Sequence, residues 1–288
     1  MDINWYPGHM TKARRMIEAL LPSVDCVVEL VDARIPLSSK NPDIEKITQN
    51  KPKLLILNKS DIADPKMNKW WQAYFEEKGY SVMLFDSRTK KAASTAMFIG
   101  KIKDIFAEKL ERQKQRGIVG KSVKIMVLGI PNVGKSTFIN NISGQKVAKA
   151  EDRPGVTRGK QWISLQNGID MLDMPGILWP KLENKYAAQN LAITGAIKDN
   201  VLDIEGLAMV LLGILKVHYK NELCLRYKLP DELPEDNYEL LKLVAKKRGF
   251  MISGGHVDTE RAAIILIDEF RGCKIGKITL DNLDKNES

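Results

Sequence analysis

The sequence predicts an α/β fold with a doubly wound, mostly parallel sheet, followed by a smaller all-α region. Two patterns support this prediction. Short apolar segments, of the kind that are buried on both faces of a parallel sheet, alternate with helix-like stretches as far as Asp173. After Pro180 the apolar residues recur at spacings of three and four, which is typical of helices. We therefore expect two domains, residues 1–178 and 179–288.

Five apolar segments are the expected strands of the sheet: 25–32, 53–58, 81–85, 123–128 and 170–173. The helix-like stretches between them are 66–78, 95–115 and 136–142. The last of these helices follows a glycine-rich loop. This alternation favours strands that are joined by crossover helices on both faces of the sheet.

The second region contains three stretches with helical spacing: 205–219, 238–248 and 259–270. Pro230 and Pro234 interrupt the pattern between the first two stretches, and they predict a loop there. No strand-like segment lies among them, so we expect this region to pack helix on helix.

The composition excludes several protein classes. With 44% hydrophobic and 28% charged residues, the chain can bury a large core. Its apolar runs are shorter than the roughly 18 residues of a spanning helix, and its N-terminus lacks a signal-peptide pattern. The three cysteines are far apart and fit neither a disulfide framework nor a zinc site. We expect a cytoplasmic protein, monomeric in solution, with no membrane partner.

The excess of basic residues favours a polyanionic partner without proving one. The net charge is +9, and residues 101–124 contain eight basic residues against three acidic ones. A helix face exposed to solvent would show the same run of charge, so both interpretations of this segment stay open.

A phosphate-binding loop is predicted at residues 129–136, where GIPNVGKS fits G-x-x-x-x-G-K-S between an apolar strand and a helix. In such a loop the backbone N–H groups and the helix N-terminus face the phosphates. Lys135 would reach the β- and γ-phosphates, and the Ser136 hydroxyl would ligate Mg²⁺. The residues expected to contact the phosphates are Asn132, Val133, Gly134, Lys135, Ser136 and Thr137.

Two further segments complete the expected phosphate and magnesium site. Asp173 and Gly176 belong to DMPG at the end of an apolar strand, where the carboxylate can hold the magnesium shell and the glycine N–H can meet the γ-phosphate. Thr157 lies in RPGVTRG, a composition that suits a switch loop whose hydroxyl reaches Mg²⁺ only when the γ-phosphate is present. An ordinary surface turn is the alternative for this second segment.

A guanine-reading motif is predicted at residues 58–61, NKSD, which follows an apolar strand. Asp61 could accept hydrogen bonds from the guanine N1–H and amino groups, and an unpaired buried acceptor costs about 1–3 kcal/mol, which would disfavour other bases. Asn58 would brace the neighbouring loops, and the stem of Lys59 would lie across the base. Ser87 is placed to offer a backbone N–H near the guanine oxygen. A plain strand-to-helix turn is the alternative.

These motifs occur in an unusual order, because the guanine-reading motif precedes the phosphate-binding loop. In this order the sequence resembles the circularly permuted GTPases of ribosome assembly. The resemblance rests on WYPGHMTKA, VDARIPLSSKNP, NKSD, GIPNVGKS, RPGVTRG, DMPGILWPK and, near the C-terminus, AKKRG and GGHVDTERAA. Permutation is physically permissible because the termini of α/β domains often lie close together at the surface.

The resemblance implies a function. It implies a P-loop GTPase with a low intrinsic rate that ribosomal particles stimulate, Mg²⁺ as cofactor, and GTP and GDP as ligands. It further implies binding to the rRNA of a late precursor of the large (50S) ribosomal subunit, maturation of that particle, and release on GTP hydrolysis. The rival interpretations are an RNA-binding scaffold with GTP as a structural ligand, and a P-loop ATPase or a GTPase that acts on tRNA or membranes.

The expected catalytic group is not the usual one. Ile177 follows DMPG, at the position where many GTPases carry a glutamine that orients the attacking water, and its side chain has no polar atom. The resemblance implies that His9 positions the water, with packing or an RNA contact as the alternative role. It also matches Asn132 to a position that ligates a potassium ion in related GTPases.

Two basic clusters are the expected RNA contacts. Part of the second cluster has a structural explanation, because cations are favoured at helix C-termini. The resemblance nevertheless implies salt-dependent contacts with rRNA phosphates. The residues are Lys12, Arg14, Arg15, Lys246, Lys247 and Arg248.

Overall fold

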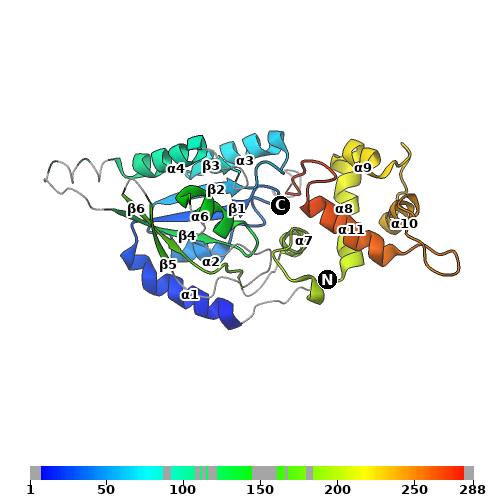
Figure 1. The fold of residues 1–288 in the computed structure, drawn as a ribbon, viewed down its shortest axis with the longest axis horizontal. Helices are drawn as coiled ribbons and strands as arrows, with labels where there is room; N and C mark the ends of the chain where they lie inside the picture. The colour runs from blue at the N-terminus through cyan, green and yellow to red at the C-terminus, as the bar shows by residue number, and fades with distance from the viewer. Residues whose placement is uncertain are drawn as a thin grey trace.

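The computed structural model describes residues 8–86, 92–107, 111, 115, 122–144, 161–165, 168–179 and 184–281. Figure 1 shows a sheet with helices on both sides, and a group of helices beside one end of the sheet. The sheet has six strands in the order β3-β2-β1-β4-β6-β5. In chain order they are β1 (Cys26–Asp32), β2 (Lys53–Asn58), β3 (Ser81–Phe85), β4 (Val123–Gly129), β5 (Gln161–Leu165) and β6 (Ile169–Asp173).

The sheet is parallel except at one edge, where β5 runs antiparallel to β6. All seven residues of β1 are buried, as expected for a central parallel strand that is covered on both faces. The parallel strands all end at the same edge of the sheet. This edge brings Asp32, Asn58, Gly129 and Asp173 to one side of the molecule.

Within the described residues, five helices cover the two faces. One face packs against α4 (Ala92–Ile105) and α6 (Lys135–Ser143), whose Phe98 and Phe138 are fully buried. The other face packs against α1, α2 and α3, through side chains that include Ile17 and Trp71. The bounds of these three helices are Gly8–Leu20, Pro42–Ile47 and Pro65–Glu77.

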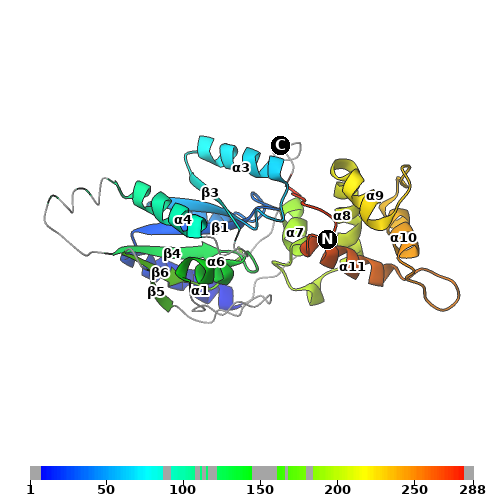
Figure 2. The same cartoon turned by 45° about the horizontal axis from the view of Figure 1, so that its top comes forward.

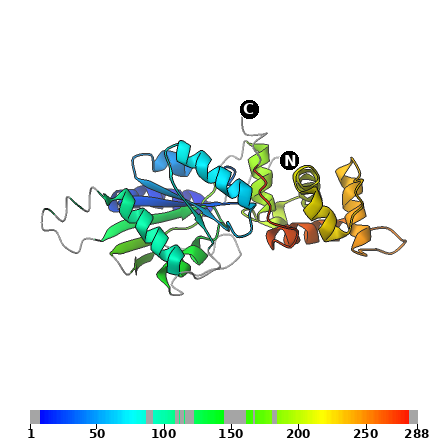
Figure 3. The ribbon, with the colours of Figure 1, turned by 90° about the horizontal axis from the view of Figure 1, so that it is seen from above.

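The remaining helices form the group beside the sheet (Figure 3). In this group α8 packs against α7, α9, α10 and α11. The helices are α7 (Lys185–Ile193), α8 (Ile204–His218), α9 (Lys220–Tyr227), α10 (Asn237–Lys247) and α11 (Thr259–Arg271). Short 3-10 turns lie at Leu21–Ser23 and Asp199–Val201. Aspartates cap several helix N-termini, as Asp203 does for α8 and Asp236 for α10.

After α11 the chain does not stay with the helical group. Figure 2 shows this last described segment turning back toward α3 and the sheet. Residues Ile278–Asp281 are buried there, and the Leu280 N–H donates to the Arg34 carbonyl, 2.7 Å away. The sheet half of the molecule therefore includes residues from the C-terminal part of the chain.

The predicted fold class is confirmed, and the five expected strands are all present. The edge strand β5 and the helices α1, α2, α7 and α9 were not expected from the sequence pattern. The division into residues 1–178 and 179–288 stays a prediction. None of the helices within the described residues combines the length and the apolar character that crossing a membrane requires.

Candidate functional site

The predicted phosphate-binding loop lies between β4 and α6, at the edge where the parallel strands end. Gly134 begins α6 with a left-handed backbone, φ 92°. A Cβ added at this glycine would lie 2.5 Å from the Asn58 side-chain nitrogen, so no larger residue fits. The first turn of α6 follows the loop without a break. Its backbone N–H groups and its partial positive charge therefore face the loop.

A buried ion pair occupies the centre of this loop. Lys135 at the start of α6 pairs with Asp173 at the end of β6, and both side chains are almost fully buried. Burial outweighs the nearby carboxylate and lowers the pKa of Lys135. The structure therefore brings together the predicted phosphate-binding lysine and the predicted magnesium carboxylate.

Three other predicted residues lie around this pair. Ser136 and Thr137 are half-buried in the first turn of α6. A Cβ added at Gly176 would lie 3.0 Å from the Pro131 backbone nitrogen, so this glycine packs directly against the loop. By contrast, the Ile177 side chain points away into the core between the sheet and α1, where it is 1% exposed.

The NKSD motif contacts the other side of the same loop. Asn58 donates a hydrogen bond of 2.7 Å to the Val133 carbonyl. Lys59 has a left-handed backbone, φ 61°, and its ammonium group donates to the Asn132 carbonyl at 2.6 Å. The first two residues of the guanine-reading motif therefore hold the phosphate-binding loop in place.

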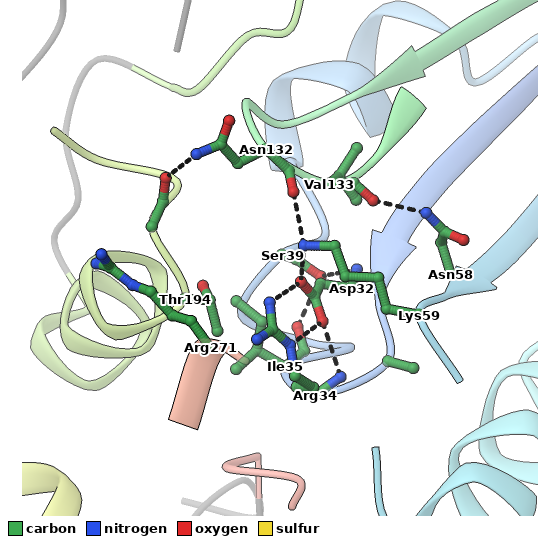
Figure 4. Close-up of polar contacts among 12 residues, drawn as sticks. Asp32, Arg34, Ile35, Ser39, Asn58, Lys59, Asn132, Val133, Thr194 and Arg271 are labelled. Carbon is green, nitrogen blue, oxygen red and sulfur yellow. Dashed lines mark hydrogen bonds and ion pairs between the residues drawn. The ribbon is translucent and has the colours of Figure 1, made fainter. Parts of the chain in front are cut away.

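Lys59 also belongs to a charged cluster that the sequence analysis missed. Figure 4 shows its ammonium group beside the Asp32 carboxylate, 2.9 Å away. Arg34 binds the same carboxylate through two nitrogens, at 2.9 and 2.7 Å. Although burial alone would raise it, these two cations hold the pKa of Asp32 well below its usual range. One signal was available, namely an aspartate at the carboxyl end of a strand that neighbours the NKSD strand.

Asp61 lies in the turn after β2. The turn is fixed by hydrogen bonds from the Ile62 N–H to the Lys59 carbonyl and from the Ser60 N–H to the Phe85 carbonyl. Asp61 itself is half-buried. Its neighbour Asp64 caps α3.

Asn132 links the phosphate-binding loop to the helical group. Its backbone is left-handed, φ 58°, and its side-chain amide donates to the Gly195 carbonyl at 2.6 Å. Gly195 follows α7, whose last carbonyls, those of Ala192 and Ile193, accept from Arg271. The orientation of the Asn132 amide is thus set by the helical group.

Several predicted residues fall outside the described part of the chain, namely Ser87, Thr157 and the side chain of His9. His9 itself lies in the first turn of α1. The roles assigned to these residues stay predictions.

The predicted RNA-binding residues divide into two groups. Lys12 and Arg15 on α1 are exposed, as are Lys246 and Lys247 at the end of α10. The two other arginines are engaged within the chain. Arg14 pairs with Glu18 and Asp43, and Arg248 donates to Glu269 at 2.6 and 2.8 Å.

Comparison with known proteins places this geometry in a family. Residues 124–230 match the model of the 50S ribosome-binding GTPase family. Over 288 residues the chain is 43% identical to ribosome biogenesis GTPase A of Priestia megaterium, covering 100% of this chain and 99% of that protein. The chain belongs to the ribosome biogenesis GTPase A family.

Two solved structures of the family have a similar fold. GNP-bound YlqF from T. maritima is 25% identical, covers 94% of this chain and 98% of its own, and has a TM-score of 0.65. GDP-bound YlqF is also 25% identical, covers 94% and 100%, and has a TM-score of 0.67. The chain is accordingly a GTPase that binds GTP and GDP, and the resemblance noted from its motifs is confirmed.

Family membership explains the order of the motifs. NKSD at the end of β2 precedes the phosphate-binding loop after β4, yet β1 alone separates these strands in the sheet. The permuted chain therefore assembles the same edge of the sheet from segments in a different order.

Proposed function

We propose that this GTPase binds a late precursor of the large ribosomal subunit through its rRNA, promotes maturation of that particle, and is released on GTP hydrolysis. Family membership is the observation that carries the proposal. The contact between Asn132 and Gly195 supports it, because it joins the nucleotide site directly to the helical group.

The proposed nucleotide site uses the residues predicted from the sequence. Asp61 reads the guanine, Lys59 lies across it, and Ser87 contributes a backbone N–H. Lys135 and the N-terminus of α6 bind the phosphates. The hydroxyls of Ser136 and Thr157 and the carboxylate of Asp173 would hold Mg²⁺, and such hard oxygen donors are the ligands that this ion prefers. Bound Mg²⁺ would neutralise charge on the β- and γ-phosphates.

Entry of the nucleotide requires a rearrangement of the central ion pair. Lys135 has to exchange part of its contact with Asp173 for phosphate oxygens. This exchange would keep both groups charged and paired, because the lysine would gain the phosphate oxygens and the Asp173 carboxylate would help to hold Mg²⁺.

Hydrolysis needs a group other than Ile177 to orient the water, since the Ile177 side chain is buried in the core. We assign this role to His9, from the first turn of α1. A potassium ion held by Asn132 is the second candidate for stabilising charge in the transition state. The fixed orientation of the Asn132 amide is consistent with a ligand role.

The exposed basic residues suit contact with RNA phosphates. Lys12 and Arg15 lie on α1, and Lys246 and Lys247 lie on α10, in different halves of the molecule (Figure 1). We propose that rRNA contacts both halves, residues 1–178 and 179–288. We place the protein in the cytoplasm, as a monomer.

GTP turnover with and without large-subunit particles tests this proposal. We expect a large stimulation by large-subunit precursors, a weak one by small subunits, and weaker binding as salt rises. An RNA-binding scaffold would show no stimulation by either particle, and that result would overturn the proposal.

The role of His9 has a separate test. His9→Ala should lower particle-stimulated turnover by about 10²-fold while GTP affinity stays nearly unchanged. Equal stimulated turnover in both proteins would remove His9 from the mechanism.

A further inference from the structure

The segment that returns from the helical group to the sheet consists of Ile278, Thr279, Leu280 and Asp281, and we call it the return strap. All four side chains are fully buried. They lie more than 200 positions from the loops that they contact. A buried segment with this many polar contacts holds the groups around it in fixed positions.

The strongest contact of the return strap is the carboxylate of Asp281. It accepts hydrogen bonds from the backbone N–H groups of Leu37 and Ser38, at 2.7 and 2.8 Å. The Ser38 hydroxyl and the Asn190 side chain donate to its other oxygen. Three of these four donors belong to the loop that follows β1, so the buried carboxylate fixes this loop and joins it to α7.

This loop leads back to the base-reading side of the site. The Leu280 N–H donates to the carbonyl of Arg34. The Arg34 side chain holds Asp32, and Asp32 holds the ammonium group of Lys59. The return strap thus supports Lys59 through two intermediate residues.

A second set of contacts reaches the far side of the NKSD turn. The Thr279 hydroxyl accepts from the backbone N–H of Asp64 at 3.2 Å and lies 3.4 Å from the Ala33 carbonyl. Tyr219 of the helical group donates to the carbonyl of Thr279 and lies 3.2 Å from the Asp64 carboxylate. Asp64 lies three positions after Asp61, so the turn is held on both sides.

Within the described residues, the return strap makes no direct hydrogen bond to the phosphate-binding loop. Within the described residues, its hydrogen bonds go to the loop after β1, the start of α3, Trp71, Tyr219 and α7, and none goes to residues 129–136. Loosening it should therefore affect the two ends of the nucleotide unequally.

We infer that Thr279 and Asp281 are positioning residues for guanine recognition, because they hold Lys59 and Asp61 in place on either side of the NKSD turn. The inference rests on the proposed role of Asp61 as the guanine reader. It assigns part of the base specificity to a segment that follows the helical group in the chain.

The affinities for GDP and IDP provide the test, because IDP lacks the amino group that Asp61 is proposed to read. Titration calorimetry on the full-length protein gives the ratio of the two dissociation constants. We expect Thr279→Val and Asp281→Asn to lower the preference for GDP by about 5-fold or more, because a displaced acceptor no longer meets the amino group. Thr279→Ser keeps the hydroxyl and should retain the wild-type ratio.

Two controls separate positioning from stability. Thr48→Val removes another fully buried threonine hydroxyl, which bonds to the Ile44 carbonyl, and it should lower stability without changing the ratio. If Asp281→Asn does not fold, the comparison of Thr279→Val with Thr279→Ser still decides the question. An unchanged ratio in Thr279→Val would overturn the inference.

A third control separates this inference from the site assignment. Asp61→Asn replaces the acceptor with an amide and should abolish the preference for GDP over IDP. If it does not, the assignment of Asp61 is wrong. If Asp61→Asn loses the preference while both return-strap variants keep it, only the positioning role is wrong.

Discussion

The phosphate-binding end and the base-reading end of the site are held in place by different kinds of contact. The phosphate end consists of one continuous loop and helix start, with Asp173 beside Lys135, hydrogen bonds from Asn58 and Lys59 to the loop, and one from the loop to Gly195. The base end depends on a buried cluster around Asp32 and on residues more than 200 positions away. A short local motif can thus specify phosphate binding, whereas base reading depends on the folding of distant segments.

The largest expected effect is at the base end, in Asp32→Asn. Losing this carboxylate leaves the buried Arg34 and the half-buried Lys59 without their shared counter-charge, which should cost about 3–5 kcal/mol of unfolding free energy. Urea unfolding of the nucleotide-free protein measures this loss. Asp170→Asn is the control, because this carboxylate accepts from Ser122 and Ser164 in part-buried and exposed hydrogen bonds; it should cost less than about 1 kcal/mol. Equal costs would show that the base end does not depend on its charged cluster.

The next effect belongs to the phosphate end. Lys135→Met should weaken the binding of both GDP and IDP by about 10²-fold, because a charged contact to the phosphates is lost while the contacts to the base remain. Calorimetric titration of both nucleotides measures this effect, and Lys124→Met, on the exposed part of β4, should bind both normally. A changed preference between GDP and IDP would contradict the separation of the two ends.

A pH-dependent effect should arise behind the base end, at Glu29 on β1. Burial raises the pKa of Glu29 to about 7, despite the nearby lysines. Its favourable neutral form is therefore fully populated below the ordinary carboxylate pKa and is lost as pH rises through about 7. Glu29→Gln is neutral at every pH. Its unfolding free energy, relative to that of the wild type, should therefore increase by about 1–3 kcal/mol as pH rises from about 5 to about 8.5.

Urea unfolding at both pH values checks this gain, and a carboxylate in the helical group gives the control. Although burial opposes it, hydrogen bonds from Arg226 and Tyr227 lower the pKa of Glu269 to about 2, so Glu269 stays ionised over this range. Glu269→Gln should therefore lose a constant amount of unfolding free energy. The GDP to IDP ratio should not vary with pH, because Asp32 also stays ionised. A varying ratio would place a titrating group at the base end.

The smallest effect concerns the hydrogen bond that links Asn132 of the phosphate end to Gly195 of the helical group. Gly195 has φ 81°, and a Cβ there would lie 3.4 Å from the Arg271 guanidinium and 3.6 Å from the Asn132 amide nitrogen. Gly195→Ala should weaken the binding of GDP and of IDP equally, by roughly 3- to 5-fold. The left-handed backbone at this position should also cost the variant about 1 kcal/mol of stability through strain. Gly249→Ala has a similar φ, 69°, and no neighbour within 4 Å, so it should show the strain alone. Identical nucleotide affinities in the two variants would mean that the link does not affect the phosphate end.

The sequence predicted best what depends on neighbouring residues. The strands, the loop around Gly134 and the meeting of Lys135 with Asp173 all follow from apolar segments and a motif with fixed spacing. The return strap could not be predicted, because Asp281 has no local pattern that points to Ser38. The same reason applies to the pairing of Arg14 with Asp43 and of Arg248 with Glu269, because each of these acidic partners comes from another helix. The edge strand β5 was missed because its sequence, QWISL, is interrupted by polar residues and lacks the continuous apolar run of the central strands.

The return strap also bears on how the protein is made. Domains fold in order as the chain is synthesised, starting from the N-terminus. Apart from Gly195, the described residues of the phosphate end have all been synthesised once the ribosome has added Gly176 to the chain. The base end, although Asp61 is among the earliest residues of the site, lacks its support until synthesis has passed Asp281. A nascent chain should thus be able to bind phosphates before it acquires its full preference for guanine.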